Sequence, residues 1–589
     1  MKNKTRNIII YVICGILVLA IIVGMIFAVI KIIGKTASQN NDSSFNGSSI
    51  FESGSNSTSS NNSSSVGGGS SQGGSTSTPN STSNPTSNST SNSTSSNTNG
   101  LLNTGNWSVV QKATMPTISG KSMTRSEMEK LYRPHTEWRI YEIRTTKTEI
   151  KPKVGGTAYY VSNRGVVSND GLTPETPFKN ANQLKNVKLK AGDVVYFERG
   201  SVFRANFTAD VEGVTYTAYG EGKKPEFYTS YKNFASPDIW KATDQKNVYL
   251  CTEKLYTDVG NIVFEEKTCG YKVMLAKRDN GDTYNYSDGK NFKDYHDFSK
   301  DLQFYHDTSS GKLYLRCDKG NPGKIYDRIE LSIKGSGIKV TAKNVTIDNL
   351  CVKYVGSHGV ASGSNEGLTV QNCEFGWIGG AIATVSSSGI PTRFGNGVEI
   401  YGSAKNFTVK NCYFYQNYDA GPTFQYKSSA ADAPKIVMSN IKFTDNVMEY
   451  CNYSIEYFLT ASKDSYIEKV TIDGNLMWYA GEGLCSQRPD KNRDAHIKSW
   501  MHENRRQGDF KVTNNLFVLA ENYLSETYDI TNKGAVYSSN IYIQYVNNLL
   551  GQNAGNKEPP KFGTVAEAEK RIRSEFKDYS AKVICITGD

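Results

Sequence analysis

The sequence predicts an all-β solenoid that follows a transmembrane helix and a disordered stalk. Three observations support this organisation: an apolar run near the start of the chain, a segment composed mainly of Ser, Asn, Thr and Gly, and an asparagine-centred segment that recurs through the second half. A unit that recurs with loops of variable length is typical of a chain that grows by stacking. A length of 589 residues therefore does not require several compact cores.

The first 35 residues have the composition of an uncleaved signal anchor. Basic residues precede an apolar run from Ile8 to Ile30, which is about long enough to cross a bilayer as a helix. The run is longer than a typical signal-peptide core, and no A-x-A motif follows it. We expect residues 1–35 to be a cytoplasmic tip and a single membrane anchor, with the rest of the chain at the outer surface of the cell.

Residues 36–105 contain too few apolar side chains to offset the conformational entropy lost on folding, so we expect a flexible stalk. The whole chain has a net charge of +10, and residues 1–105 carry five basic and two acidic side chains, which leaves +7 for residues 106–589. A basic surface favours anionic partners such as acidic glycans, although solubility alone would also account for it. We expect a monomer with no nucleic-acid partner.

Seven asparagines share one sequence context. The segments are TIDNLCV, TVQNCEF, TVKNCYF, FTDNVME, IDGNLMW, VTNNLFV and YVNNLLG, centred on Asn349, Asn372, Asn411, Asn446, Asn475, Asn515 and Asn548. Asparagines stacked on successive turns would form an amide ladder inside a β-coil. The alternative, seven unrelated loop asparagines, leaves the shared flanks unexplained. Cys373 and Cys412 directly follow two of them, and we expect buried free thiols there rather than disulfides.

Three segments before this series resemble a known family. They are YYVSNRGVVSNDGLTPETPFKNANQL, AGDVVYFERGSVFRANF and GVTYTAYGEGKKP, between Tyr159 and Pro225. Their order resembles the N-terminal entry of bacterial right-handed parallel β-helix proteins of the pectate-lyase-like superfamily. The resemblance implies this fold over residues 155–550. It leaves the reaction open, because the superfamily includes polysaccharide lyases, glycoside hydrolases, epimerases and proteins with no known activity.

The remaining segments are expected to surround the coil. Residues 106–154 form an N-terminal extension with a short helix to Leu131, introduced by a capping box of Thr124 and Glu127. Residues 235–330 read as a β-rich insertion with a hairpin, and residues 551–589 as a helical cap over the open end of the solenoid.

Each asparagine segment is followed, after a loop, by another short strand. Successive side chains of a strand point to opposite faces. The residues predicted to point inward are Val360, Val398, Pro422, Ile455 and Ile497. The outward column is Ala361, Glu399, Thr423, Glu456 and Lys498, and the next outward column includes Tyr401, Gln425, Phe458 and Trp500.

These outward columns predict a carbohydrate site. Glu399 and Glu456 are two turns apart, so their backbones lie roughly 10 Å apart, and their side chains could reach the separation of about 6.5–9.5 Å found in inverting glycosidases. The aromatic members of the second column are suited to stacking on sugar rings. The substrate-binding candidates are Tyr401, Gln425, Phe458 and Trp500.

Two reactions fit these residue types. In hydrolysis, Glu399 and Glu456 are the paired carboxylates, with Asp419 as a replacement for either. In β-elimination, Lys498 or Arg488 abstracts a proton beside a uronate carboxylate.

Two further residue types fit the same site. In β-elimination, Asp419 and Asp494 hold Ca²⁺, which takes oxygen ligands. His496 could serve in either reaction.

Each candidate also has a structural interpretation. Asp419 and Asp494 could cap turns, Glu456 and Lys498 could form only a cross-strand ion pair, and Arg488 lies in a charged loop. We therefore expect a membrane-anchored extracellular protein that cleaves a polysaccharide, as a lyase or a glycoside hydrolase, with Ca²⁺ as the one candidate cofactor. The alternatives are a non-catalytic glycan-binding or adhesion protein and a structural component of the cell envelope.

Overall fold

The computed structural model describes residues 105, 107–490, 493–500, 505–527, 533–554 and 558–588. The anchor expected at 1–35 lies outside the described residues, as does the stalk expected at 36–105 apart from residue 105. Among the described helices, none is both long enough and apolar enough to cross a membrane.

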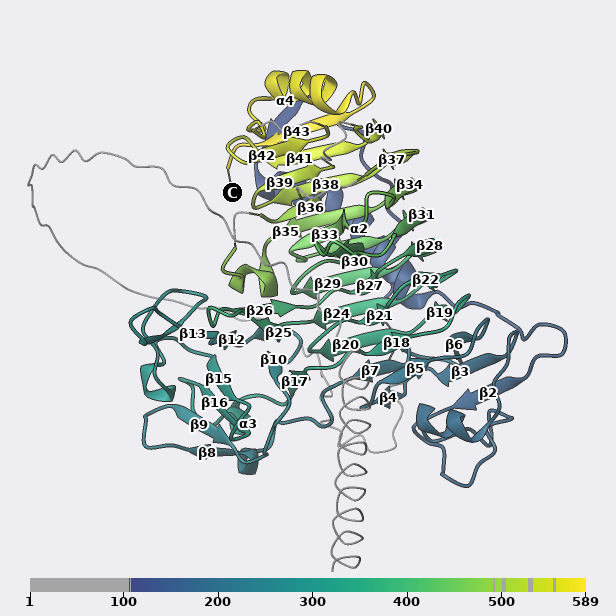
Figure 1. Cartoon of the computed structure of the whole chain (residues 1–589), viewed down its shortest axis with the longest axis vertical. Helices are drawn as coiled ribbons and strands as arrows, with labels where there is room; N and C mark the ends of the chain where they lie inside the picture. Colours follow the sequence, from purple (N-terminus) through teal and green to yellow (C-terminus); the bar gives the residue numbers. More distant parts are fainter. Residues whose placement is uncertain are drawn as a thin grey trace, which may run out of the picture.

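The described chain winds into a coil whose wall consists of three sheets, named A, B and C here (Figure 1). Sheet C has the order β5 (Phe207–Ala209), β18 (Ile338–Val340), β21 (Val360–Ser362), β27 (Val398–Tyr401), β30 (Pro422–Lys427), β33 (Tyr453–Thr460), β36 (Ala495–Ser499), β39 (Tyr523–Glu526) and β42 (Leu549–Gln552).

Sheet B contains β2 (Ala158–Val161), β3 (Val194–Glu198), β6 (Thr215–Tyr219), β19 (Thr346–Asp348), β22 (Asn365–Glu366), β23 (Thr369–Gln371), β28 (Ala404–Lys410), β31 (Val437–Thr444), β34 (Tyr466–Asp473), β37 (Phe510–Thr513) and β40 (Val536–Ser538). Sheet A contains β1 (Lys121–Met123), β4 (Val202–Phe203), β7 (Glu226–Tyr228), β10 (Val259–Phe264), β11 (Thr268–Cys269), β17 (Ile329–Ile333), β20 (Cys351–Val355), β24 (Glu374–Ile378), β29 (Tyr413–Asn417), β32 (Val447–Glu449), β35 (Leu476–Ala480), β38 (Leu516–Ala520), β41 (Ile541–Tyr545) and β43 (Lys582–Ile586).

Like side chains stack inside the coil. Phe375 and Phe414 lie on neighbouring turns with ring centroids 4.9 Å apart, and Phe424 and Tyr457 repeat the arrangement at 5.5 Å. Both pairs belong to one continuous apolar core that runs along the coil. Because each turn buries its inward side chains against the next, the coil gains core in proportion to its length.

The amide ladder exists and includes three of the predicted members. Asn446, Asn475 and Asn515 donate from Nδ2 to Oδ1 of the next member at 2.9–3.1 Å, and the series ends on Asn540 and Asp578. Asn548, predicted as the last member, instead donates to the Ala520 carbonyl.

In the earlier turns Asn411 Nδ2 donates to Asn372 Oδ1 at 2.6 Å, as predicted, but this pair lies one position before the column that contains Asn446. Strand pairing places Cys373 and Cys412, not the asparagines before them, in line with Asn446. Asn349, Asn372 and Asn411 have φ between 50° and 56° and occupy the left-handed turn position that asparagine tolerates. All nine cysteines of the described residues are free thiols, and Cys373 and Cys412 are buried, as predicted.

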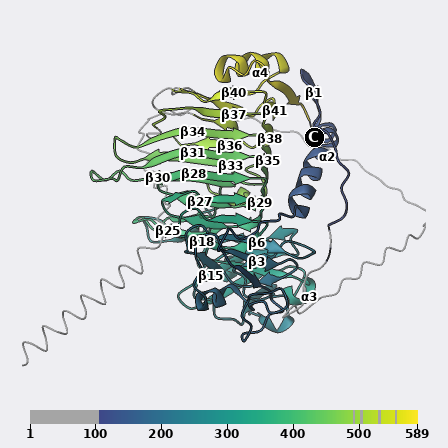
Figure 2. The ribbon, with the colours of Figure 1, turned by 90° about the vertical axis from the view of Figure 1, so that its right-hand side faces the viewer.

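Helix α2 (Arg125–Thr145) lies along the outer face of sheet A (Figure 2). Its capping box of Thr124 and Glu127 forms as predicted, but the helix extends well beyond Leu131 and continues through Pro134. Its apolar side chains pack against sheet A, and Thr136 accepts a hydrogen bond from Trp478 Nε1 at 3.1 Å. Tertiary packing therefore stabilises the second half of this helix.

The segment predicted as an insertion carries its own sheet. The strands are β8 (Trp240–Ala242), β9 (Val248–Cys251), β16 (Lys312–Arg316), β15 (Gln303–Asp307) and β12 (Tyr271–Lys272), beside the pair β13 (Leu275–Lys277) and β14 (Thr283–Asn285). Its helical elements are η2 (Pro237–Ile239), η3 (Tyr295–Asp297) and α3 (Pro322–Ile325), while η1 (Ala181–Asn186) lies earlier in the chain. Strands β15 and β16 form the predicted hairpin.

At the other end, α4 (Val565–Arg571) and the π-helical turn η5 (Ile572–Phe576) lie over the last turns of the coil (Figure 1). Ala568, Ile572 and Phe576 belong to the main core, so these helices bury the apolar end of the solenoid. Strand β43 follows them and pairs in parallel with both β41 and β1. The sequence analysis did not predict this strand.

Candidate active site

Sheet C contains the predicted outward column in the predicted register. Glu399 pairs with Thr423, Thr423 with Glu456, and Glu456 with Lys498 across successive strands. Val398, Ile455 and Ile497 lie in the main core, so their neighbours in the column point away from it. The column continues beyond the prediction to Glu526 and Gln552.

The outward column is nevertheless buried, because loops from other turns cover it. Glu399, Glu456 and Lys498 are 2%, 4% and 6% exposed. The hairpin of β25 (Ala381–Val385) and β26 (Pro391–Phe394) and the loop of η4 (Gly483–Gln487) contribute to this cover. Together they leave a narrow pocket with a cavity volume of about 40 Å³. It is lined by His358, Phe394, Asn396, Glu399, Tyr401, Asp419, Gln425, Lys427, Glu456, Phe458, Arg488 and Trp500.

Glu399 is held as a carboxylate by polar neighbours. His358 Nδ1 lies 3.0 Å from Oε2, and Asn396 Nδ2 donates to the same oxygen. Burial opposes ionisation of Glu399, but His358, Asn396 and Gln425 outweigh it, so the pKa of this carboxyl lies below its ordinary value. Glu399 is thus ionised at neutral pH.

Glu456 has the opposite electrostatic environment. Trp500 Nε1 donates to Oε1 at 2.5 Å, and Phe458 lies in the same small apolar cluster as Trp500. Burial, followed by the nearby charge of Asp419, raises the pKa of Glu456 well above its ordinary value. Glu456 therefore keeps its proton to a higher pH than an ordinary glutamate does, in contrast to Glu399.

Asp419 and Arg488 form an ion pair at the wall of the pocket. Arg488 Nη1 donates to Asp419 Oδ1 at 3.0 Å, and its other guanidinium nitrogens bind Asp490. Burial raises the pKa of Asp419, although the Arg488 charge opposes that shift. Arg488, held by two carboxylates, is fixed as a cation rather than available as a base.

Thr423 occupies the position between the two glutamates in the column. Its side chain is fully buried, and its hydroxyl has no hydrogen-bond partner among the described residues. A buried hydroxyl without a partner carries a desolvation cost that a bound water or ligand group removes.

The structure does not bring Lys498 or His496 into the pocket lining. Lys498 forms a buried ion pair with Glu526. His496 Nδ1 lies 2.9 Å from Ser454 Oγ, and its Nε2 donates to the Val518 carbonyl at 3.1 Å. The imidazole ring packs on Phe517. Burial lowers the pKa of His496 to about 3, so it is a neutral interior side chain.

The two predicted calcium ligands do not converge. Asn522 donates to both carboxylate oxygens of Asp494, at 2.8 and 2.7 Å, and burial raises the pKa of Asp494 to about 7. Asp419 is bound to Arg488. Among the described residues, no group of three or more His, Cys, Asp or Glu side chains is arranged to hold a metal ion.

Three pocket residues were missed by the sequence analysis. His358 was not among the predicted site residues, whereas it contacts Glu399. Asn396 binds Glu399 and accepts a hydrogen bond from the Ala420 amide at 2.9 Å. Phe394 reaches the pocket on a hairpin that has no counterpart in the repeat. The alignment of the repeats therefore could not place it beside the site.

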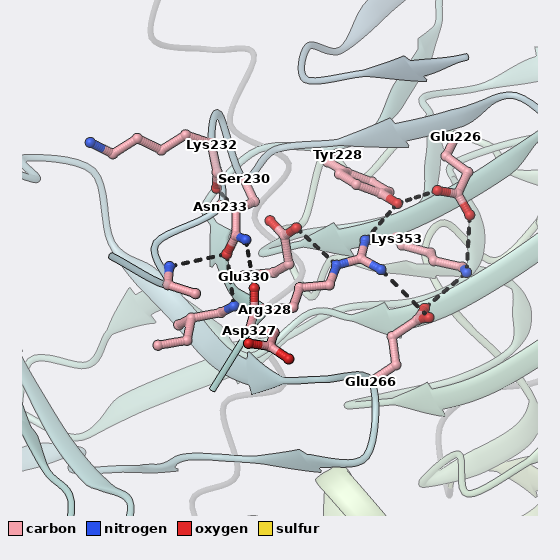
Figure 3. Close-up of polar contacts among 12 residues, drawn as sticks. Glu226, Tyr228, Ser230, Lys232, Asn233, Glu266, Asp327, Arg328, Glu330 and Lys353 are labelled. Atoms are coloured by element: carbon pink, nitrogen blue, oxygen red, sulfur yellow. Dashed lines mark hydrogen bonds and ion pairs between the residues drawn. The ribbon is translucent and has the colours of Figure 1, made fainter. Parts of the chain in front are cut away.

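A second polar cluster joins the insertion to the coil outside the pocket (Figure 3). Lys353 is buried and lies 3.2 Å from Glu226 and 2.9 Å from Glu266. Arg328 donates to Tyr228 at 2.8 Å and also approaches Glu266. Each of these charged side chains has a partner of opposite charge, which is what a structural junction requires.

Comparisons with known proteins agree with the coil. Residues 331–555 match a family described as "Right handed beta helix region". The predicted right-handed parallel β-helix fold is thereby confirmed. No curated protein sequence matches the chain.

Several solved structures resemble the chain at low identity. A complex of XylC with xylose is 13% identical, covering 69% of this chain and 73% of that one with a TM-score of 0.39. A GH136 lacto-N-biosidase from Eubacterium ramulus is 14% identical, covering 73% and 61% with a TM-score of 0.35. A rhamnogalacturonan lyase is 13% identical, covering 69% and 84% with a TM-score of 0.36. These similarities are too low to transfer a reaction.

Proposed function

We propose that this protein is a carbohydrate-active enzyme that hydrolyses a glycosidic bond in the pocket on sheet C. One observation carries the proposal: Glu399 and Glu456 face outward in one pocket, and their surroundings shift their pKa values in opposite directions. A protonated and an ionised carboxyl group within one site are the acid and base that glycoside hydrolysis needs.

In the proposed mechanism, Glu456 protonates the leaving oxygen and Glu399 acts on the opposite side of the sugar. The glutamates are two strands apart in register, a backbone separation of roughly 10 Å. This spacing favours an inverting reaction, in which Glu399 activates a water molecule. The unpartnered hydroxyl of Thr423 lies between them and is suited to bind that water.

β-Elimination, the runner-up reaction, has weaker support. Its candidate bases are Lys498 and Arg488, and each is bound to a carboxylate. Lys498 does not line the pocket, and the Arg488 guanidinium, held by two carboxylates, is a poor base. Tyr401, Phe458 and Trp500 supply aromatic surface for a sugar in either reaction, and also in a binding protein without activity.

Incubation of the purified full-length protein with neutral and acidic polysaccharides tests the reaction. Hydrolysis produces new reducing ends without absorbance near 232–235 nm, whereas a lyase produces unsaturated products that absorb there. Tight binding of a polymer that is never shortened would favour a glycan-binding protein instead.

We also propose that the enzyme works at the outer surface of a cell, as a monomer tethered through residues 8–30. The apolar run and the Ser, Asn, Thr and Gly segment support this location. Cleavage of the stalk by a protease added to intact cells would release activity into the medium. Activity that stays protected inside intact cells would contradict this topology.

A further inference from the structure

The pocket is closed at one end by the hairpin β25–β26. Phe394, at the end of β26, packs edge-on against His358 with ring centroids 4.9 Å apart, and both side chains line the pocket beside Glu399. Nothing in a regular parallel coil would cover the outward face of sheet C at this level. The hairpin therefore covers the part of the pocket that contains His358 and Glu399.

The insertion holds the hairpin firmly. Arg393 donates from Nε to the Gly380 carbonyl at 2.6 Å and from Nη2 to the Gly260 carbonyl at 3.0 Å, and its guanidinium lies 4.1 Å from the Tyr418 ring centroid. The backbones approach so closely that a Cβ on Gly260 would lie 2.3 Å from the Ala381 amide nitrogen.

A buried ion pair of the insertion strengthens this attachment. Asp258 Oδ2 accepts a hydrogen bond from the Ile382 amide at 2.7 Å, and Lys272 Nζ binds both oxygens of Asp258 at 2.6 Å. In Figure 1 the hairpin lies between the coil and the insertion strands β12 and β13. The hairpin is thus a rigid wall rather than a mobile flap.

The same insertion holds the second loop of the pocket. Gln487 Nε2 donates to the Gly270 carbonyl at 2.8 Å, and its Oε1 accepts from the Lys272 amide at 3.3 Å. The next residue in the chain is Arg488, which binds Asp419 inside the pocket. The insertion therefore positions both the β25–β26 hairpin and the η4 loop.

From this arrangement we propose that the enzyme acts on chain ends. This inference rests on the proposed hydrolysis. A polymer lying across successive turns of sheet C would have to pass through Phe394 and the hairpin beside Glu399. Only a terminal sugar or a short oligosaccharide enters a pocket closed in this way, so the enzyme releases small sugars and leaves the interior of the polymer intact.

The product pattern of the full-length protein tests this proposal. The probes are the same neutral and acidic polysaccharides, together with oligosaccharides carrying a fluorescent label at the reducing end. We expect a small sugar to accumulate while the molar mass of the polymer, measured by size-exclusion chromatography, stays close to its starting value. An early fall in molar mass would overturn the chain-end inference alone, whereas no cleavage of any probe would overturn the proposed function and this inference together.

Matched variants of one hairpin test its role. Phe394→Ala opens the closed end, and we expect the ratio of internal to terminal cleavage to rise by about tenfold or more, equivalent to about 1.4 kcal/mol of differential binding. Val385→Ala, at a side chain 59% exposed on the same hairpin, should keep the original ratio. Arg393→Lys keeps the positive charge but cannot donate to the Gly380 and Gly260 carbonyls at the same time. It should also raise the ratio of internal to terminal cleavage. Identical product patterns for Phe394→Ala and Val385→Ala would show that the hairpin does not set the mode of cleavage.

Discussion

Replacing Glu456 by Gln is the sharpest test of the proposed mechanism. The amide keeps the shape of the side chain and can still accept the hydrogen bond from Trp500 Nε1, but it cannot give up a proton. Losing a positioned general acid lowers turnover by roughly 10²–10⁴-fold, or about 3–5 kcal/mol of transition-state stabilisation. We expect kcat to fall by this factor.

The folded state should tolerate this change. The pKa of Glu456 is raised in the folded protein, so its protonated form stabilises the fold at low pH, and that contribution is lost as the pH rises through the raised pKa. A neutral amide avoids that loss. We therefore expect Glu456→Gln to melt at or above the wild-type temperature at pH 8, when followed by circular dichroism.

The assay should distinguish proton donation from a general structural effect. Aryl glycosides with good leaving groups need little protonation, so Glu456→Gln should lose much less activity on them than on the natural linkage. Glu468→Gln, on the neighbouring sheet B where Glu468 binds Ser439, serves as the matched control and should keep full activity. Unchanged turnover of Glu456→Gln, or an equal loss for every leaving group, would remove Glu456 from the role of acid.

Four other outcomes follow from the same structure. The pH profile of kcat/KM should be bell-shaped. Its acid limb should lie below the ordinary glutamate pKa of about 4.3 because the pKa of Glu399 is lowered, and its alkaline limb above that value because the pKa of Glu456 is raised. If Glu399→Gln lost the alkaline limb and kept the acid limb, the assignment would be contradicted. Thr423→Val should lower kcat by roughly 10-fold without loss of stability, since it removes a hydroxyl that has no partner among the described residues; Thr423→Ser should retain activity. The double variant Lys498→Met with Glu526→Gln removes a buried ion pair without leaving a lone charge, and should keep hydrolysis while abolishing any lyase activity. Asn475→Ala should lower the free energy of unfolding by roughly 3–5 kcal/mol in urea titrations, because it leaves Asn446, Phe443 and Asn515 without their hydrogen bonds, whereas Asn548→Ala should cost far less.

The register of the site was predictable because it depends only on strand periodicity. Once the short strands of sheet C were aligned, alternation placed Glu399 and Glu456 on the outer face, as the strand pairing shows. The ladder was harder to predict. Asn372 and Asn446 occur in nearly the same sequence context. Asn372 nevertheless occupies the left-handed turn, whereas Asn446 lies one position further along its turn and points into the core.

The sequence by itself determined the coil, because a repeating pattern of apolar residues, turn residues and short strands can bury its core only by stacking. It also determined the order of side chains along sheet C, since each strand has a period of two. Only the tertiary structure decided what that column can do. The pocket forms where a hairpin, a loop and an insertion from distant parts of the chain meet. Burial and neighbouring groups then raise the pKa of Glu456 and lower the pKa of Glu399, and these shifts depend on contacts in space that no local pattern specifies.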